Sequence, residues 1–411
     1  MTEPPKAEEP RRGGDLGRQL NERLRGMHWS GLPLLLAVVL LGFLYPYYVD
    51  SLNDVTYFGD FIPSVNSMVI MIVFTMMAVG LNIVVGYAGL LDLGYVAFYA
   101  AGAYTAAWFA SLQFDQVTLH FGSVGINREA PGIHLSIWLV LLIAGIITLV
   151  VGILIGLPTL RLRGDYLAIV TLGFGEIIPQ FVRNGDNFFG FDLTHGTFGI
   201  SPIDSPGFGE TGESLGLPLA YRQEFNANEL FFWTALVLLL ITVFCSVRLR
   251  DSRLGRAWIA IREDETAAAA MGVPLMRTKT WAYAIGAFFG GVAGAYYASF
   301  KSGAFPADFF FNISIFLLCM VILGGMGSVW GAVLGGMILG WLNVEGLATI
   351  GSKINQAGLA IEVPKYQFGI YGLIIVLMML FRPTGLISER RHKRELEEGV
   401  HDEALYDATH G

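Results

Sequence analysis

Charged residues are scarce in this chain of 411 residues. They make up 15% of the sequence, whereas soluble domains carry about 25%, and apolar residues make up 54%. The mean hydropathy is +0.56. This deficit excludes an ordinary soluble domain and indicates a polypeptide built for a lipid bilayer. The formal net charge of −8 gives no reason to expect a nucleic-acid partner.

Cysteine and the common catalytic motifs are also nearly missing. The two cysteines, Cys245 and Cys319, both lie in apolar runs, so we expect neither a disulfide framework nor a metal cluster. No lysine follows a glycine, which rules out a P-loop, and there is no H-E-x-x-H. We therefore expect no catalytic residue and no cofactor in this chain, and we expect that it is not an enzyme by itself.

What the sequence does contain is a series of long apolar runs. A helix needs about 20 apolar residues to cross the hydrocarbon core of a bilayer. Ten runs approach or reach that length, and they are residues 31–49, 62–85, 90–112, 133–157, 166–182, 229–247, 280–300, 312–323, 329–342 and 366–381. The first run is expected to be a retained anchor, because no A-x-A cleavage pattern follows it.

Basic residues set the orientation of these spans. With a cytoplasmic N-terminus, the inner segments are the first 30 residues, 158–165, 248–279 and the chain from Arg382, and they hold 20 of the 26 Lys and Arg. Positive residues favour the cytoplasmic side. We therefore expect an all-α polytopic membrane protein with about ten transmembrane helices and both termini in the cytoplasm.

Three parts follow from this assignment. They are a cytoplasmic tail (1–30), a transmembrane domain (31–385) and a second cytoplasmic tail (386–411). Within the domain, residues 183–228 form a long outer loop with Pro202, Pro206 and Pro218 as breakers. That loop is either a small ordered cap for a partner outside the membrane or a flexible connector.

Glycine interrupts the apolar runs at three places. One cluster (80–94) joins the second and third runs, a second lies at 173–175, and a third (324–331) separates the eighth and ninth runs. Broken spans at corresponding places in two halves of a transporter point to a translocation route. The first and third clusters occupy similar places in runs two to five and seven to ten, so we expect an inverted repeat.

Polar and aromatic residues near these glycines are the candidates for a translocation pathway. A carboxylate within a span is costly unless it faces protein, water or a partner. Two interpretations stay open for each acid: a pathway wall, or a side chain that accepts backbone amides freed by neighbouring glycines. Packing or interfacial anchoring is the alternative for each tyrosine. The candidates are Asn82, Asp92, Tyr95, Tyr99, Thr171, Gly173, Glu176 and Gly325.

The segment 248–279 lies between two spans and holds seven of the basic residues. Asp251 or Ser252 can cap the start of a helix, small and apolar residues then recur at helical spacing, and Gly272 with Pro274 forms a stop. The pattern predicts one short amphipathic helix whose small-residue face suits docking to a soluble partner. An ordinary solvated loop helix is the alternative.

Four motifs resemble one family of membrane proteins. They are GLNIVVGYAGLLDLGYVAFYAAGAY (80–104), LPTLRLRGDYLAIVTLGFGEI (157–177), RLGRAWIAIREDETAAAAMGV (253–273) and VILGGMGSVWGAVLGG (321–336). In this order they resemble the LivM-type permease subunits of bacterial ABC importers for branched-chain amino acids. The resemblance covers roughly residues 31–385.

The resemblance implies that 253–273 is a coupling helix, the counterpart of the E-A-A-x-x-x-G motif that docks onto an ATPase. Ala267, Ala268 and Gly272 match the small residues and the glycine, whereas Thr266 stands at the first position with Glu265 one place early. Which acid contacts the ATPase therefore stays open. The residues implied in coupling are Arg256, Glu263, Asp264, Glu265, Ala267, Ala268 and Gly272.

The resemblance also implies partners. They are a second, unlike permease subunit, two cytoplasmic ABC ATPase subunits that bind the ATP, a periplasmic amino-acid-binding protein, and the lipid of a bacterial inner membrane. Alternatives are a permease for urea or short-chain amides within the same family, an ion-coupled secondary transporter that uses Asp92 or Glu176, and a passive channel. The secondary transporter gives the cytoplasmic helix no task, and glycine-rich broken spans would also allow the channel.

Overall fold

The computed structural model describes residues 42–49, 61–122, 131–162, 164–187, 190–207, 228–356 and 362–387. The chain divides into two units, 1–51 and 52–411. Of the first unit, residues 42–49 are described, and they are largely helical. Most of the first predicted span, the predicted N-terminal tail and residues 388–411 of the predicted C-terminal tail lie outside the described residues.

Every remaining predicted span coincides with a helix of the second unit. These helices are α4 (Val65–Asn82), α5 (Val96–Phe109), α6 (Ile137–Thr159), α7 (Asp165–Arg183), α9 (Asn228–Asp251), α12 (Leu275–Phe300), α13 (Asn312–Gly324), α14 (Val329–Trp341) and α16 (Gln367–Phe381). Two π-helical segments extend this set, η2 (Ile83–Tyr87) after α4 and η7 (Leu342–Gly346) after α14, and α15 (Leu347–Gln356) follows η7. Short 3-10 turns complete the described elements: η3 (Gly185–Asn187), η4 (Gly196–Phe198), η6 (Pro306–Asp308) and η8 (Val363–Tyr366).

Six of the described helical runs are long and apolar enough to cross a membrane. They are Val65–Tyr87, Ile137–Thr159, Asn228–Asp251, Pro306–Gly324, Val329–Gln356 and Val363–Phe381. The predicted span 90–112 is shorter than expected, because residues 88–95 form a turn and α5 begins only at Val96. The chain is therefore a mostly helical, multi-pass membrane protein.

Helix α12 is the centre of the packing and lies against both α6 and α5. Its glycines permit this, because their backbones approach neighbouring helices directly. A Cβ on Gly102 of α5 would stand 2.0 Å from the carbonyl oxygen of Gly291 on α12, and a Cβ on Gly291 would stand 2.1 Å from Oγ1 of Thr148 on α6. The three helices are thus held closer together than side chains would allow.

A small sheet departs from the all-α prediction. Strands β1 (Ala110–Ser111), β2 (Thr118–Phe121) and β3 (Gly132–Leu135) pair in the order β1-β3-β2, antiparallel for β1 with β3 and parallel for β2 with β3. The prediction overlooked them because β1 and most of β3 lie at the ends of apolar runs that were assigned to spans, and β2 lies in the loop between those runs. The sheet is too small to change the class of the fold.

The described part of the long loop 183–228 is ordered against this sheet. The amide of Asp204 donates to the carbonyl of Ala110 at 2.9 Å, and Ile200 exchanges backbone hydrogen bonds with Ala304 at 3.0 and 3.1 Å. His134 Nδ1 lies 3.0 Å from an Asp204 carboxylate oxygen. These contacts favour the ordered-cap interpretation for residues 190–207; residues 208–227 lie outside the described part.

The C-terminal end of the second unit is attached at residues 384–387 and at Tyr371, which is buried and donates from its hydroxyl to the side-chain oxygen of Asn343 at 2.8 Å. The amides of Leu386 and Ile387 donate to the carbonyls of Leu323 and Gly324 at 3.0 and 2.9 Å, so residues 384–387 cover the turn between α13 and α14. Of the spanning helical run Val363–Phe381, which contains α16, only 6% is buried. This helix therefore depends little on contacts with its own unit.

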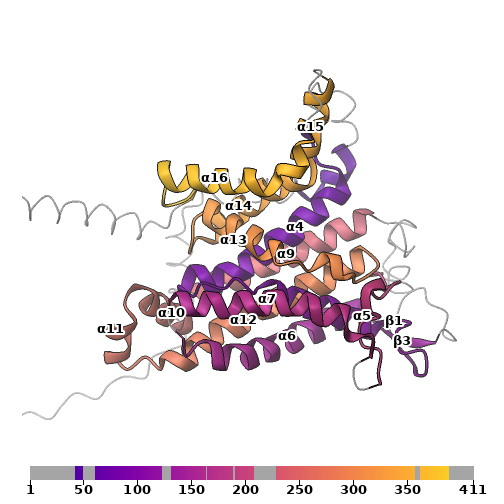
Figure 1. Ribbon diagram of the computed structural model, residues 1–411, viewed down its shortest axis with the longest axis horizontal. Coiled ribbons are helices and arrows are strands. Elements are labelled where there is room, and N and C mark those ends of the chain that lie inside the picture. The colour runs from indigo at the N-terminus through magenta and orange to yellow at the C-terminus, as the bar shows by residue number, and fades with distance from the viewer. Residues whose placement is uncertain are drawn as a thin grey trace, which may run out of the picture. The chain divides into compact units, whose positions relative to one another are not determined.

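Figure 1 shows α6, α7 and α12 running side by side in the second unit. Two short helices, α10 (Arg253–Glu263) and α11 (Glu265–Ala270), lie at one end of these long helices, and the sheet lies at the opposite end. The segment between α9 and α12 is thus separated from the sheet by the full length of the helices.

The close approach of α5 and α12 gives a testable prediction. We expect Gly102→Ala to lower the thermal unfolding midpoint of the purified chain in detergent, by an amount that corresponds to about 1–3 kcal/mol, because the added methyl overlaps the Gly291 carbonyl. Gly372→Ala on α16 is the matched control, since a Cβ there meets nothing within 4 Å. Equal midpoints for the two variants would contradict the packing described above.

Candidate coupling site

The segment between α9 and α12 forms two helices where one was predicted. Ser252 caps α10 by accepting a hydrogen bond from the amide of Gly255 at 3.1 Å, as predicted. The prediction of a single helix was wrong because Asp264 adopts an extended conformation (φ −152°, ψ 110°) and ends α10. Its carboxylate accepts hydrogen bonds from the amides of Thr266 and Ala267 at 2.7 and 2.9 Å, which starts α11. A short acidic side chain competes with the helix backbone in this way.

Two contacts fasten this segment to α12. The indole of Trp258, which is completely buried, donates to the carbonyl of Thr278 at 2.8 Å. Lys279 is 5% exposed, and its ammonium lies 2.8 Å from a carboxylate oxygen of Glu265. A lysine this deeply buried requires a partner. Both α10 and α11 are therefore held to the first turn of α12.

A third contact fastens the segment to the end of α4. The guanidinium of Arg262 donates to the carbonyl of Gly86 in η2. Gly89 follows with φ +68°, and a Cβ there would stand 2.9 Å from Cγ of Arg262. The arginine thus lies directly on the backbone of the glycine-rich turn. We call the segment 252–274, with its three attachments, the coupling segment.

The outward side of the coupling segment is formed by small or flexible residues. Met271 is 86% exposed, Ala267 is exposed, and Ala268 is buried. Gly272 has φ +85°, as its predicted role as a helix stop requires, and a Cβ there would meet nothing within 4 Å. The remaining predicted coupling residues Arg256, Glu263 and Asp264 are exposed, whereas Glu265 is half-buried by its pair with Lys279.

Asn82 lies one helical turn from Gly86, the residue that Arg262 contacts, and joins α4 to the turn between α13 and α14. It is completely buried at the end of α4. Its side-chain oxygen accepts from the amide of Gly327 at 2.9 Å, and its amide nitrogen donates to the carbonyl of Ser328 at 3.4 Å. Gly325, another predicted site residue, lies in the same turn with φ +114° against the C-terminal residues 384–387.

Asp92 and Thr171 meet in a second buried cluster. The carboxylate of Asp92 is completely buried and accepts from the amide of Gly94 at 2.9 Å, and the phenol of Tyr283 lies against it. The hydroxyl of Thr171 on α7 accepts from the amide of Leu93 at 3.1 Å. Asn82 and Asp92 thus satisfy amides in glycine-rich turns, which is the structural interpretation left open for such side chains.

The predicted tyrosines are part of the core. Tyr95 is completely buried and donates from its hydroxyl to the carbonyl of Gly286 at 2.8 Å. Tyr99 is 1% exposed, and its ring centroid lies 5.2 Å from that of Phe309. Both contacts join α5 to segments beyond α9, so packing explains these residues in the subunit. Their predicted role in a pathway stays a prediction.

Glu176 and Gly173 lie apart from these clusters, on an exposed face of α7. Glu176 and Gln180 are exposed, and a Cβ on Gly173 would meet nothing within 4 Å. The structure therefore brings Asn82 and Gly325 together and Asp92 and Thr171 together. It leaves Glu176 at the surface of the subunit.

Three residues that hold the coupling segment were missed from the sequence: Trp258, Arg262 and Lys279. Lys279 carried a signal, because a lysine at the start of an apolar run is costly unless it is paired. Arg262 carried none, since its acceptor is a backbone carbonyl 176 residues away. Among the described residues, no cluster of His, Cys, Asp or Glu could hold a metal ion.

The Lys279–Glu265 pair gives a second prediction. We expect Glu265→Ala to lower the free energy of unfolding by about 1.5–3 kcal/mol, because the buried ammonium loses its charged partner. The double variant Glu265→Ala with Lys279→Met should recover most of that loss, since an apolar side chain fits the buried site without a partner. Thermal unfolding is measured for the unmodified protein, Glu265→Ala, Lys279→Met and the double variant, which together form a double-mutant cycle. If the losses of the two single variants simply add in the double variant, the pairing is contradicted.

Comparison with known proteins places this geometry in a family. The family described as branched-chain amino acid transport system, permease component, matches residues 64–380. The permease protein LivM of the high-affinity branched-chain amino acid transport system of Escherichia coli (strain K12) is 35% identical over 339 residues, which cover 80% of this chain and 71% of that protein. A probable LivM of Methanocaldococcus jannaschii is 28% identical over 335 residues, 76% of this chain and 90% of that protein.

A second kind of permease is also similar. LivH of Escherichia coli (strain K12) is 29% identical over 176 residues, which cover 41% of this chain and 52% of LivH. No solved structure matches the chain. The family match spans α4 to α16 and so includes the coupling segment and both buried clusters. The chain belongs to the permease components of branched-chain amino acid transport systems.

Proposed function

We propose that this chain is the permease subunit of an ATP-driven importer of branched-chain amino acids, that it forms half of the translocation pathway, and that its coupling segment docks onto an ATPase. The observation that carries the proposal is the coupling segment itself. It lies beyond the ends of the long helices, exposes Ala267, Met271 and Gly272, and is fastened by Trp258 and Lys279. The attachments hold these exposed small residues in a fixed position, as docking to a partner requires.

The attachments connect the coupling segment mechanically to the membrane helices. Force applied to α10 reaches η2 through the bond from Arg262 to Gly86. From η2 it reaches Asn82, and Asn82 holds the turn between α13 and α14 through Gly327 and Ser328. A π-helical segment inside a helix often marks a functional site. We infer that η2 is the element through which ATPase movements change the arrangement of α4 and α13.

The membrane arrangement follows from the distribution of charge. We propose ten transmembrane helices, with both termini and the coupling segment on the cytoplasmic side of a bacterial inner membrane, because 20 of 26 basic residues then lie inside. The sheet and residues 190–207 lie outside in this orientation. We also propose an inverted repeat that relates runs two to five to runs seven to ten, on the glycine clusters that interrupt the runs in each half.

The proposed partners are a second, unlike permease, two ATPase subunits and a periplasmic amino-acid-binding protein. Similarity to both LivM and LivH, two permease proteins of one organism, supports an unlike partner of the same fold. The lack of a P-loop in the chain requires ATP to be bound by other subunits. The ordered outer cap, residues 190–207 with the sheet, offers a surface for the binding protein.

The pathway is proposed to run along the exposed face of α7, between the two permeases. A carboxylate in a membrane span needs water or a protein partner, and Glu176 is exposed on that face together with Gln180 and the open Gly173. The buried residues Asn82 and Asp92 do not line this pathway. They fix the turns that position α5 and α7.

Reconstitution tests this function. In vesicles that hold the complete complex, we expect ATP-dependent uptake of leucine, isoleucine and valine when their binding protein is present, and no uptake of urea or acetamide. The isolated chain should neither accumulate leucine nor discharge a leucine gradient. Uptake by the isolated chain driven by an ion gradient would overturn the proposal, and uptake of urea in place of leucine would overturn the substrate.

Gly272 gives a sharper test of coupling. We expect Gly272→Arg to reduce ATP-driven leucine uptake by at least tenfold, because a long cation on the docking surface blocks the ATPase, while membrane insertion is retained since the position is open to solvent. Gly272→Ala is the matched control: it has the same unfavourable positive φ, which costs about 1 kcal/mol, but adds only a methyl.

The readouts for both variants are uptake, ATP hydrolysis and recovery of the ATPase with the purified complex. Normal uptake by Gly272→Arg would mean that the ATPase docks elsewhere. A loss as large in Gly272→Ala would assign the effect to the backbone and not to the docking surface.

A further inference from the structure

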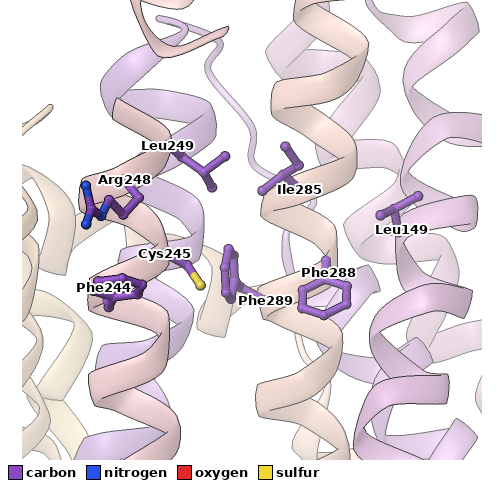
Figure 2. Close-up of a pocket in the computed structure, with 8 residues that line it drawn as sticks. All are labelled: Leu149, Phe244, Cys245, Arg248, Leu249, Ile285, Phe288 and Phe289. Carbon is purple, nitrogen blue, oxygen red and sulfur yellow. The ribbon is translucent and has the colours of Figure 1, made fainter. Parts of the chain in front are cut away.

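An apolar groove opens between α6, α9 and α12, away from the buried clusters described above. It has a volume of about 360 Å³ and is lined by Leu149 of α6, Phe244 and Cys245 of α9, and Ile285, Phe288 and Phe289 of α12. Figure 2 shows Cys245 and Phe289 between α9 and α12, with Leu149 on the third helix. The groove exists because α9 packs chiefly against α4 while α12 packs chiefly against α6 and α5, so α9 and α12 meet along little of their length.

The surroundings of the groove are apolar on both sides. Other exposed side chains of these helices are apolar too: Leu142, Ile146, Val150 and Leu154 on α6, and Val237, Leu240 and Ile241 on α9. The exposed face of α7 differs from these surfaces, since it carries Glu176 and Gln180. Exposed apolar side chains on spanning helices form the surface that hydrocarbon covers. The groove therefore opens toward lipid.

One cation lies at the rim of this groove. Arg248 lines it, is exposed, and has its guanidinium 5.4 Å from the centroid of the Phe244 ring. No described carboxylate forms an ion pair with Arg248. Arg248 lies three residues before the end of α9 at Asp251, which is about 4.5 Å along the helix axis. In the proposed orientation this is the level of the cytoplasmic headgroups.

We propose that the groove binds an anionic glycerophospholipid, with an acyl chain between α9, α12 and α6 and the phosphate on the guanidinium of Arg248. Apolar grooves that end at a basic residue on the cytoplasmic side combine the two features that such a lipid needs. A fork of N–H donors binds phosphate oxygens at two points. The lipid fills the space that the poor contact between α9 and α12 leaves and so joins the helix that precedes the coupling segment to the helix that follows it.

The proposal rests on the proposed function only for the side of the membrane, and one experiment separates the two. The complete complex is placed in vesicles that contain either photoreactive phosphatidylglycerol or photoreactive phosphatidylcholine with the same acyl chains. After illumination, peptides are mapped by mass spectrometry, and leucine uptake is measured on the same vesicles before illumination.

We expect phosphatidylglycerol to label the peptides that contain Phe244–Arg248 and Ile285–Phe289, and unlabelled phosphatidylglycerol to compete better than phosphatidylcholine. Arg248→Gln should reduce this labelling by about fivefold, the factor expected from loss of one basic residue near an anionic surface. Arg277→Gln is the matched control, because Arg277 is exposed on the first turn of α12 and does not line the groove.

Three results would overturn the lipid site. They are equal labelling by the two lipids, labelling that survives Arg248→Gln, and labelled groove peptides in the isolated chain but not in the complex, which would mean that another subunit covers the groove. If any of these occurs while leucine uptake is normal, the lipid site alone fails. Loss of uptake in unmodified complex would count against the proposed function instead.

Discussion

The structure depends on the coupling segment, which lies beyond the ends of the long helices and is still rigidly joined to them. Its helices α10 and α11 are too short to be stable alone, because isolated helices of fewer than about 12–15 residues are marginal in water. Burial of Trp258 and the bond from Lys279 to Glu265 supply what the segment lacks. The surface that faces solvent is then free to carry small residues. The contacts that stabilise the segment and the surface proposed to dock therefore lie on opposite sides of it.

The same constraint explains why glycine and buried polar groups occur together. At the end of α4 the chain leaves α-helical geometry, and η2 and the turn that follows bring Gly86 and Gly89 within reach of Arg262. Such a departure frees backbone amides and carbonyls, and each freed group that is buried needs a partner. Arg262, Asn82 and Asp92 provide those partners. Asn82 and one carboxylate oxygen of Asp92, which looked like pathway groups, therefore have a structural role as well, whereas the second carboxylate oxygen of Asp92 is buried without a hydrogen-bond partner among the described residues.

Local chemistry was predictable from the sequence, and long-range contacts were not. The cap at Ser252 and the stop at Gly272 follow from neighbours in the chain, and the apolar runs located most of the long helices, although α5 begins six residues later than the run that predicted it. The break at Asp264 was missed because the pattern of small residues continues across it. The meeting of Arg262 with Gly86 and of Asn82 with Gly327 joins residues 176 and 245 apart, which no single sequence reveals. The exposure of Glu176 likewise depends on how α7 packs.

The limited packing of α16 has a mechanical consequence. It is fixed at its end, where Leu386 and Ile387 bond to the turn after α13, and at Tyr371, which is buried against Phe316 and bonds to Asn343, while most of its other side chains are exposed. A helix that is held at few points can tilt about them when another protein pushes against its exposed face. A neighbouring subunit that packs against α16 and tilts it would therefore displace the turn between α13 and α14. Asn82 contacts the same turn from α4.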